Sequence, residues 1–240
     1  MDFTTLKAKG LVRGMTALPS ARAEFPFGLG QPGLHEIAEG AYGDRAAATG
    51  FLLAIIGQRL RGAWIWVRQT SIARDSGEVL DAALPGCPAR LRLTVQARDA
   101  HAALWAAEEA VVSGAASLVI AEVERSDFTS SRRLTLASTR HGVPVVLILP
   151  YDCEGATAAA SRWRLTSRLS APNRHDPQAP GHPRWRAVIE RCRAFPSAAG
   201  QAFDLEWNYE TLSLSMVSGL AAGPPAAYPA AGEDRFRRTG

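Results

Sequence analysis

The sequence predicts an α/β fold, in which helices flank a mostly parallel sheet that is extended by a C-terminal antiparallel β-meander. In the first two thirds of the chain, short apolar runs typical of buried parallel strands alternate with helical patterns. In the last third, apolar and polar residues alternate singly without intervening helices, which is typical of antiparallel strands. A glycine-containing turn joins the first strand to a helix that is apolar almost all round.

The parallel part of the sheet is expected to consist of short apolar strands separated by helices. The strands are predicted at residues 34–38, 63–67, 91–95, 117–121 and 143–149. The helices are predicted at residues 46–60, 75–84, 99–114 and 128–141. Asp99 is a typical helix N-cap and Gly114 a typical helix terminator, so these two residues bound the third helix.

The meander is expected to begin around Trp163 and Leu165, which alternate with polar residues. Its further strands are predicted from Trp185 onward, at residues 203–207 and at residues 212–216. Residues 170–183 contain four prolines and are predicted to form a loop or a hairpin tip.

One domain is expected at residues 31–218, after an irregular lead-in at residues 1–30 and before a disordered tail at residues 219–240. The chain has no apolar run approaching about 18 residues, so no membrane span is expected. Its start lacks a secretory signal, which makes the cytoplasm the expected compartment. The three cysteines are far apart and form no CxxC pair, so neither a metal site nor a disulfide is expected.

The turn from Gly40 to Arg45 lies where a phosphate-binding loop would join a strand to a helix. A working loop ends in Gly-Lys-Ser/Thr, because the lysine neutralises the β- and γ-phosphates and the hydroxyl binds Mg²⁺. Here Gly43 is followed by Asp44 and Arg45, so a carboxylate stands at the phosphate position and the hydroxyl is missing. We interpret the turn as a degenerate nucleotide loop, with Asp44 near the positive end of the helix dipole. A weak phosphate site made of backbone amides is the alternative.

The sequence contains no recognisable catalytic constellation, so neither enzymatic activity nor a cofactor is expected. His35 and Glu36 are neighbours in a strand and therefore point to opposite faces, which favours a structural role. His101 and His141 lie in predicted helices and are expected at the surface. No serine lies in the G-x-S-x-G elbow of hydrolases.

The net charge is +4, and arginines are concentrated in the last third of the chain. The candidate DNA-binding or partner-binding residues there are Arg162, Arg164, Arg168, Arg174, Arg184, Arg186, Arg191 and Arg193. With Trp163 and Trp185 interleaved, they could bind single-stranded DNA by phosphate neutralisation and base stacking. The period-2 pattern favours tryptophans in the core and arginines on the solvent face. The tail segment Arg235-Phe236-Arg237-Arg238 is expected to be solvated, with partner anchoring as the alternative.

The order of these parts resembles the RecA core. The segment Gly33-Leu34-His35-Glu36-Ile37 resembles the strand that enters that family's nucleotide loop. Residues 98–122, with the turn Ser113-Gly114-Ala115, resemble the helix and strand that end in the Walker B acid. Residues 184–196, followed by Phe203-Asp204-Leu205, resemble the last strands. More narrowly, GLHEI followed by the lysine-free GDRAAATGF is similar to the ImuA family, which comprises RecA-like proteins of bacterial damage-inducible mutagenesis cassettes.

The resemblance to the ImuA family implies a non-catalytic accessory factor of translesion synthesis and mutagenesis in the DNA damage (SOS) response. The implied partners are ImuB, an inactive Y-family polymerase homologue, and an error-prone replicative-type polymerase, with DNA as a further candidate contact. The resemblance also implies that Glu122 is a remnant of the Walker B acid. RecA-like cores often stack edge to edge, so a homo-oligomer is expected.

Two departures from the RecA pattern argue against ATP hydrolysis and recombinase-style DNA binding. The second strand ends in Arg68-Gln69-Thr70, where the family has the carboxylate that orients the attacking water. The segments that match the two DNA-binding loops, near Ser126-Asp127 and at residues 152–155, are short and partly acidic. The alternatives are a divergent ATPase of the RecA class, in which Arg45 replaces the lysine, and a SulA-like inhibitor of cell division.

Overall fold

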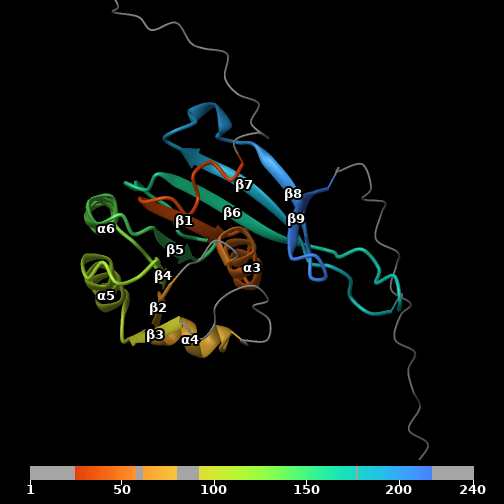
Figure 1. Cartoon of the computed structure of the whole chain (residues 1–240), viewed down its shortest axis with the longest axis horizontal. Helices are drawn as coiled ribbons and strands as arrows, with labels where there is room; N and C mark the ends of the chain where they lie inside the picture. The colour runs from red at the N-terminus through yellow and green to blue at the C-terminus, as the bar shows by residue number, and fades with distance from the viewer. Residues whose placement is uncertain (1–24, 58–61, 80–91, 177, 218–240) are drawn as a thin grey trace, which may run out of the picture.

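The computed structural model describes residues 25–57, 62–79, 92–176 and 178–217 (Figure 1). In these residues, nine strands form one sheet in the order β3-β2-β4-β5-β1-β6-β7-β8-β9. The strands are β1 (Leu34–Glu39), β2 (Trp64–Gln69), β3 (Arg92–Ala97), β4 (Leu118–Glu122), β5 (Val145–Leu149), β6 (Ser161–Arg168), β7 (Arg184–Cys192), β8 (Ala202–Asn208) and β9 (Ser213–Met216). The helices are α3 (Arg45–Ile56), α4 (Thr70–Ser76), α5 (Ala100–Val112), α6 (Phe128–His141) and the short 3-10 helix η4 (Pro196–Ala198).

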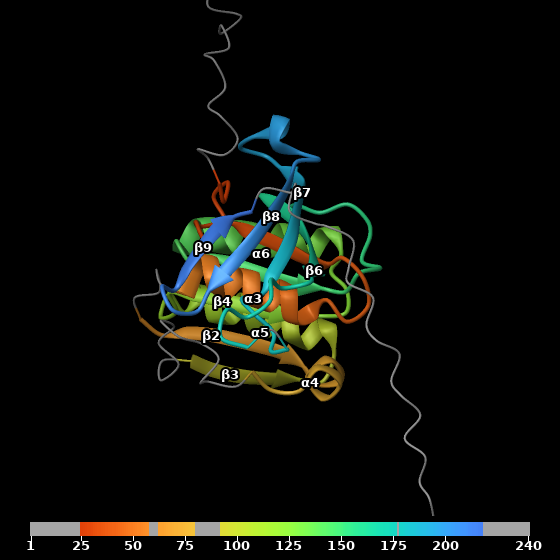
Figure 2. The same cartoon turned by 90° about the vertical axis from the view of Figure 1, so that its right-hand side faces the viewer.

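The observed sheet confirms the predicted fold class. Strands β1 to β6 pair in parallel, and β7, β8 and β9 follow β6 as an antiparallel meander. The parallel and antiparallel parts meet at β6, which pairs with β1 on one side and with β7 on the other. Figure 2 shows the strong twist of the sheet, since β7 and β8 cross the direction of β2 and β3.

Helices cover both faces of the parallel part, and each face has its own apolar core. Figure 1 shows α5 and α6 on one side of the strands and α3 on the other. The core beneath α3 contains Phe51 and continues into the meander through Trp163 and Trp185. The core beneath α5 and α6 contains Ala107 and Leu134. Trp163 and Trp185 are both buried, which confirms the core position that the period-2 pattern favoured for them.

The helix after β2 begins earlier than the sequence indicated. The pattern predicted it from residue 75, but α4 begins at Thr70, immediately after the strand. The Thr70 hydroxyl donates to the Ala97 carbonyl at 2.9 Å and fixes the first turn against β3. Gly77 ends the helix with a φ of +72°. The prediction was wrong because the polar residues of α4 give no apolar period, and the helix is fixed instead by contact with a distant strand.

The last residues of the predicted lead-in belong to the core. Phe25 and Phe27 place their ring centroids 5.9 and 6.0 Å from that of Trp163. Phe27 is 2% exposed, and the rings of both phenylalanines also contact Phe203 of β8. This segment therefore helps α3 to cover the meander.

Parts of several predictions fall outside the described residues. They are residues 1–24 of the lead-in, residues 58–60 and 80–84 of two predicted helices, Leu91 of a predicted strand, and the predicted tail at residues 219–240. Among the residues that the structure describes, no helix has the length and apolar character needed to cross a membrane.

Candidate functional site

The degenerate loop lies at the carboxyl edge of the parallel strands. Strand β1 ends at Glu39, the loop follows, and α3 begins at Arg45. On the same edge, Arg68 of β2 is paired in register with Glu122 of β4. Open α/β sheets bind their ligands at the carboxyl ends of the strands. This edge is therefore the candidate functional site.

Asp44 binds backbone amides on both sides of the loop. Its Oδ2 atom accepts a hydrogen bond from the Ala41 amide at 3.0 Å, and its Oδ1 atom accepts one from the Ser167 amide in β6 at 2.9 Å. The residue is 8% exposed and occupies the N-cap position of α3, near the positive end of the helix dipole. The carboxylate thus engages the Ala41 amide within the loop and ties the loop to β6.

The two glycines of the loop serve packing and turn geometry. The Gly40 amide donates to the Leu165 carbonyl of β6 at 2.6 Å. A Cβ atom on Gly40 would lie 2.1 Å from the Thr166 hydroxyl oxygen, so only glycine fits at this close approach. Gly43 has a φ of +93°, a conformation that glycine adopts without strain. The loop is therefore pressed directly against β6.

Arg45 forms ion pairs with two carboxylates of the parallel strands. Its Nη2 atom lies 2.5 Å from Oε1 of Glu39, and its Nη1 atom lies 3.6 Å from Oε2 of Glu122. Burial raises the pKa of Glu39, and the nearby Arg45 guanidinium partly offsets that rise. Arg45 thus neutralises the chain's own acids, whereas the lysine of a working loop neutralises phosphates.

Glu122, the predicted Walker B remnant, has both carboxylate oxygens engaged. Arg68 donates from Nε to Oε1 at 3.0 Å and from Nη2 to Oε2 at 3.4 Å, while Arg45 also approaches Oε2. Arg68 further lies 3.3 Å from Glu78 through its Nη1 atom. Glu39, Arg45, Glu122, Arg68 and Glu78 therefore follow one another with alternating charge, and we call them the charge row.

Each guanidinium of the charge row lies between two carboxylates of this chain. At the end of β2, Gln69 joins β2 to the segment after β4, because its Oε1 atom accepts a hydrogen bond from the Glu124 amide at 3.1 Å. Within the described ranges, no three His, Cys, Asp or Glu side chains form a group that could hold a metal ion. The polar groups of this edge bind one another.

Four of the eight candidate binding arginines form ion pairs with carboxylates of β1 and of the meander strands. The pairs are Arg162 with Glu36, Arg164 with Glu190, Arg184 with Glu206 and Arg186 with Asp204. Arg191 donates to the Thr157 carbonyl at 2.8 Å. Arg168 and Arg174 are exposed at one end of the β6–β7 hairpin and Arg193 at the other. The arginines are therefore spread over the meander, and four of the eight are paired with carboxylates.

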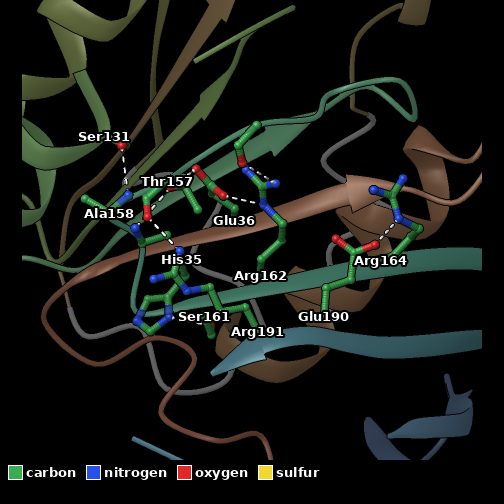
Figure 3. A network of polar contacts seen from close by, with 12 residues as sticks. His35, Glu36, Ser131, Thr157, Ala158, Ser161, Arg162, Arg164, Glu190 and Arg191 are labelled. Carbon is green, nitrogen blue, oxygen red and sulfur yellow. Dashed lines mark hydrogen bonds and ion pairs between the residues drawn. The ribbon is translucent and has the colours of Figure 1, made fainter. Parts of the chain in front are cut away.

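A buried polar network at β1 is not marked by any local sequence motif (Figure 3). Glu36 accepts from the Thr157 hydroxyl at 2.6 Å and from Arg162 Nε at 2.7 Å. On the opposite face of the strand, His35 contacts the Ser161 hydroxyl at 2.8 Å, and burial lowers its pKa. These partners lie 121 and 126 residues away in the sequence, so only the folded chain brings them together. Both side chains tie β1 to the segment that enters β6.

The chain is similar to Protein ImuA of Caulobacter vibrioides, from strains NA1000 / CB15N and ATCC 19089 / CIP 103742 / CB 15. The identity is 34% over 191 residues, which cover 73% of this chain and 76% of each relative. Among solved structures, SulA from Pseudomonas aeruginosa matches 49% of this chain and 97% of its own, with 20% identity and a TM-score of 0.38. The RadB recombinase matches 78% of this chain and 92% of its own, with 13% identity and a TM-score of 0.47. No protein-family model matches the sequence.

The sequence relationship and the sheet lead to the same assignment. The match to Protein ImuA extends over 73% of this chain and 76% of the relative. The parallel strands followed by a C-terminal antiparallel meander match the RecA-like fold class that the sequence predicted. The chain therefore belongs to the ImuA family.

Proposed function

We propose that this chain is a non-catalytic accessory factor in damage-induced translesion synthesis and mutagenesis. Membership of the ImuA family supports the cellular role. The charge row supports the non-catalytic part, and it is the observation on which the proposal rests. The groups that would bind phosphate and Mg²⁺ in a RecA-class ATPase are replaced by an arginine whose partners are the chain's own carboxylates.

The cost of nucleotide binding can be judged from Arg45. To bind a triphosphate, Arg45 would leave Glu39 and Glu122, whose side chains are 6% and 2% exposed. Breaking a buried ion pair by removing one partner costs about 3–5 kcal/mol. Glu122 would still be paired with Arg68, so we take the lower value of about 3 kcal/mol as the cost of moving Arg45. This cost corresponds to roughly a hundredfold loss of nucleotide affinity.

Asp44 disfavours nucleotide in a second way. A phosphate in the loop would compete with the Asp44 carboxylate for the amides of Ala41 and Ser167. The two negative groups would also repel each other at short distance. Binding would therefore require the loop to leave β6 as well as the charge row to open.

A chain of this kind acts through contacts with other proteins. We propose ImuB and an error-prone replicative-type polymerase as its partners, since the ImuA family is expected to act with these two proteins. Any direct contact with DNA falls to the exposed arginines Arg168, Arg174, Arg191 and Arg193, because the other four candidate arginines are paired with acids.

Calorimetry with Mg-ATP and a sensitive phosphate-release assay test the non-catalytic part. We expect neither micromolar binding nor hydrolysis by the full chain. The double substitution Asp44→Lys, Arg45→Thr restores the Gly-Lys-Thr order and shows whether the scaffold can still accept nucleotide. Hydrolysis by the unaltered chain that Arg45→Ala abolishes would establish the divergent ATPase instead.

Pull-down with purified proteins tests the partners separately. We expect the chain to retain ImuB and the polymerase. Retention of a bacterial cell-division GTPase, with no retention of ImuB, would establish the SulA-like alternative.

A further inference from the structure

Three exposed aromatic rings stand on the loops of the carboxyl edge. Tyr42, in the degenerate loop, is 89% exposed, and Tyr151, just after β5, is 45% exposed. Phe128, at the start of α6 and soon after β4, is 47% exposed. Each belongs to a different loop, so chain proximity does not explain their common location. Large exposed aromatic side chains on a soluble protein indicate an interaction surface when they lie together.

Hydrogen bonds and packing hold these loops together. The ring centroids of Tyr42 and Tyr151 lie 6.5 Å apart in an edge-to-face arrangement. Arg164 joins the backbones of both loops, because its Nη1 atom donates to the carbonyls of Glu39 and Tyr151 at 3.0 and 2.8 Å. Near Phe128, the Val123 amide donates to the Ile148 carbonyl at 3.2 Å, which joins the end of β4 to β5. The rings are therefore presented on a rigid support, which lowers the entropic cost of binding.

The exposed charges on the loops that carry Tyr151 and Phe128 are mainly negative. Asp152 and Glu154 follow Tyr151, and both are exposed without an ion pair in the described part of the chain. Glu124 and Asp127 lie between β4 and Phe128 and are also exposed. The single cation of these two loops, Arg125, lies 3.9 Å from Glu124. The surface therefore carries a surplus of carboxylates next to its rings.

We propose that Tyr42 and Tyr151, with the adjacent carboxylates Asp152 and Glu154, form a docking surface for an arginine-rich segment of a partner protein. Guanidinium groups stack on aromatic faces and pair with carboxylates, so one side-chain type satisfies both features of the surface. Single-stranded nucleic acid would also stack on the rings, but its phosphates would meet Asp152 and Glu154. The inference rests on the proposed function in that it assigns the chain a surface for protein contacts.

Fluorescence anisotropy with a labelled peptide tests this surface on the full chain. The probe is a dodecapeptide with three arginines and one phenylalanine in a glycine-serine background. The reference peptide has glutamate in place of each arginine. A labelled oligo-dT strand serves as the nucleic-acid probe. We expect saturable binding of the arginine peptide only, and weaker binding as salt is raised.

Substitutions on the proposed surface, each with a control in the β8–β9 turn, show where the peptide binds. We expect Tyr42→Ser and Tyr151→Ser each to weaken peptide binding about tenfold or more. Tyr209→Ser, in the β8–β9 turn and 51% exposed, should leave binding unchanged. Likewise, Glu154→Arg should weaken binding, while Glu210→Arg in the same distant turn should not.

Two outcomes would overturn the proposal. One is equal binding of the arginine and glutamate peptides, or arginine-peptide binding that Tyr42→Ser and Tyr151→Ser leave unchanged. The other is tight oligo-dT binding that the same tyrosine substitutions abolish, which would assign the surface to nucleic acid. These results are independent of nucleotide calorimetry and of ImuB retention, so this surface can fail while the proposed function stands.

Discussion

Removing the Arg45 guanidinium tests the charge row directly. Arg45→Ala takes away the cation that lies 2.5 Å from Glu39 and 3.6 Å from Glu122. A buried ion pair that loses one partner costs about 3–5 kcal/mol. Glu122 keeps two hydrogen bonds from Arg68, so the loss falls mainly on Glu39. We therefore expect a loss of stability of about 3 kcal/mol, the lower end of that range, and a decrease in Tm of roughly 6–12 °C for a chain of this size.

The loss of folding stability caused by Arg45→Ala is expected to depend on pH, because the Glu39 carboxyl group titrates. Burial raises the folded-state pKa of Glu39 above its ordinary value of 4.5, and Arg45 limits this rise. A carboxyl group with a raised folded pKa stabilises the folded state only while it is protonated. That contribution is complete below the unfolded pKa and is lost as the pH rises through the folded pKa. Without Arg45 the folded pKa rises further, so the variant should lose more stability at neutral pH than near pH 4.5.

Thermal and urea unfolding at neutral and mildly acidic pH measure this deficit. The double variant Arg45→Ala, Glu39→Gln removes the uncompensated charge and should recover most of the loss. Arg125→Ala is the matched control, because its side chain is 83% exposed and lies 3.9 Å from Glu124. We expect that control to change stability by less than about 0.5 kcal/mol. An unchanged Tm for Arg45→Ala, or a loss that Glu39→Gln does not reduce, would refute the reasoning.

Four further predictions concern the network, the packing and the assembly. Thr157→Val should cost about 1–3 kcal/mol in urea unfolding, because a buried carboxylate loses a donor, whereas Thr139→Val on the exposed face of α6 should be nearly neutral. Burial lowers the folded pKa of His35, so its contribution to stability is present above its ordinary pKa of 6.5 and is lost as the pH falls; His35→Gln should flatten that decline. Gly50→Ala should destabilise by about 1–3 kcal/mol despite better helix propensity, since its Cβ would lie 2.8 Å from the Trp185 ring. Light scattering should detect a homo-oligomer, and a monomer at high concentration would contradict this prediction.

Local patterns were sufficient for most of the fold. The helix predicted at residues 128–141 has the same bounds as α6, because Asp127 caps its first turn and Gly142 ends it in the left-handed conformation. The apolar runs of β4 and β5 are buried on both faces, so their composition alone indicated their place in the sheet. The start of α4 was missed because its first turn depends on a bond to β3, and no local pattern reports such a bond.

The candidate site was only partly predictable, for a related reason. The missing lysine and hydroxyl are visible in the order Gly43-Asp44-Arg45. The partners of Arg45 come from β1 and β4, and the sequence does not show that these two strands end beside the loop. The sequence also gave no sign that Ser167 of β6 donates to Asp44. Long-range strand register therefore determined which charges meet.

These contacts change the physical reason for proposing that the loop does not bind nucleotide. The sequence suggested that Asp44 repels nucleotide by its charge, whereas the structure shows this carboxylate bound to amides of the loop and of β6. Removing Asp44 alone would loosen the loop but would leave Glu39 and Glu122 with Arg45 as their partner. Restoring a lysine alone would place its charge among the same carboxylates, which would compete with the phosphates for it. The proposed loss of nucleotide binding thus rests on the charge row together with Asp44, and a combined change at residues 44 and 45 addresses both the loop and its acids.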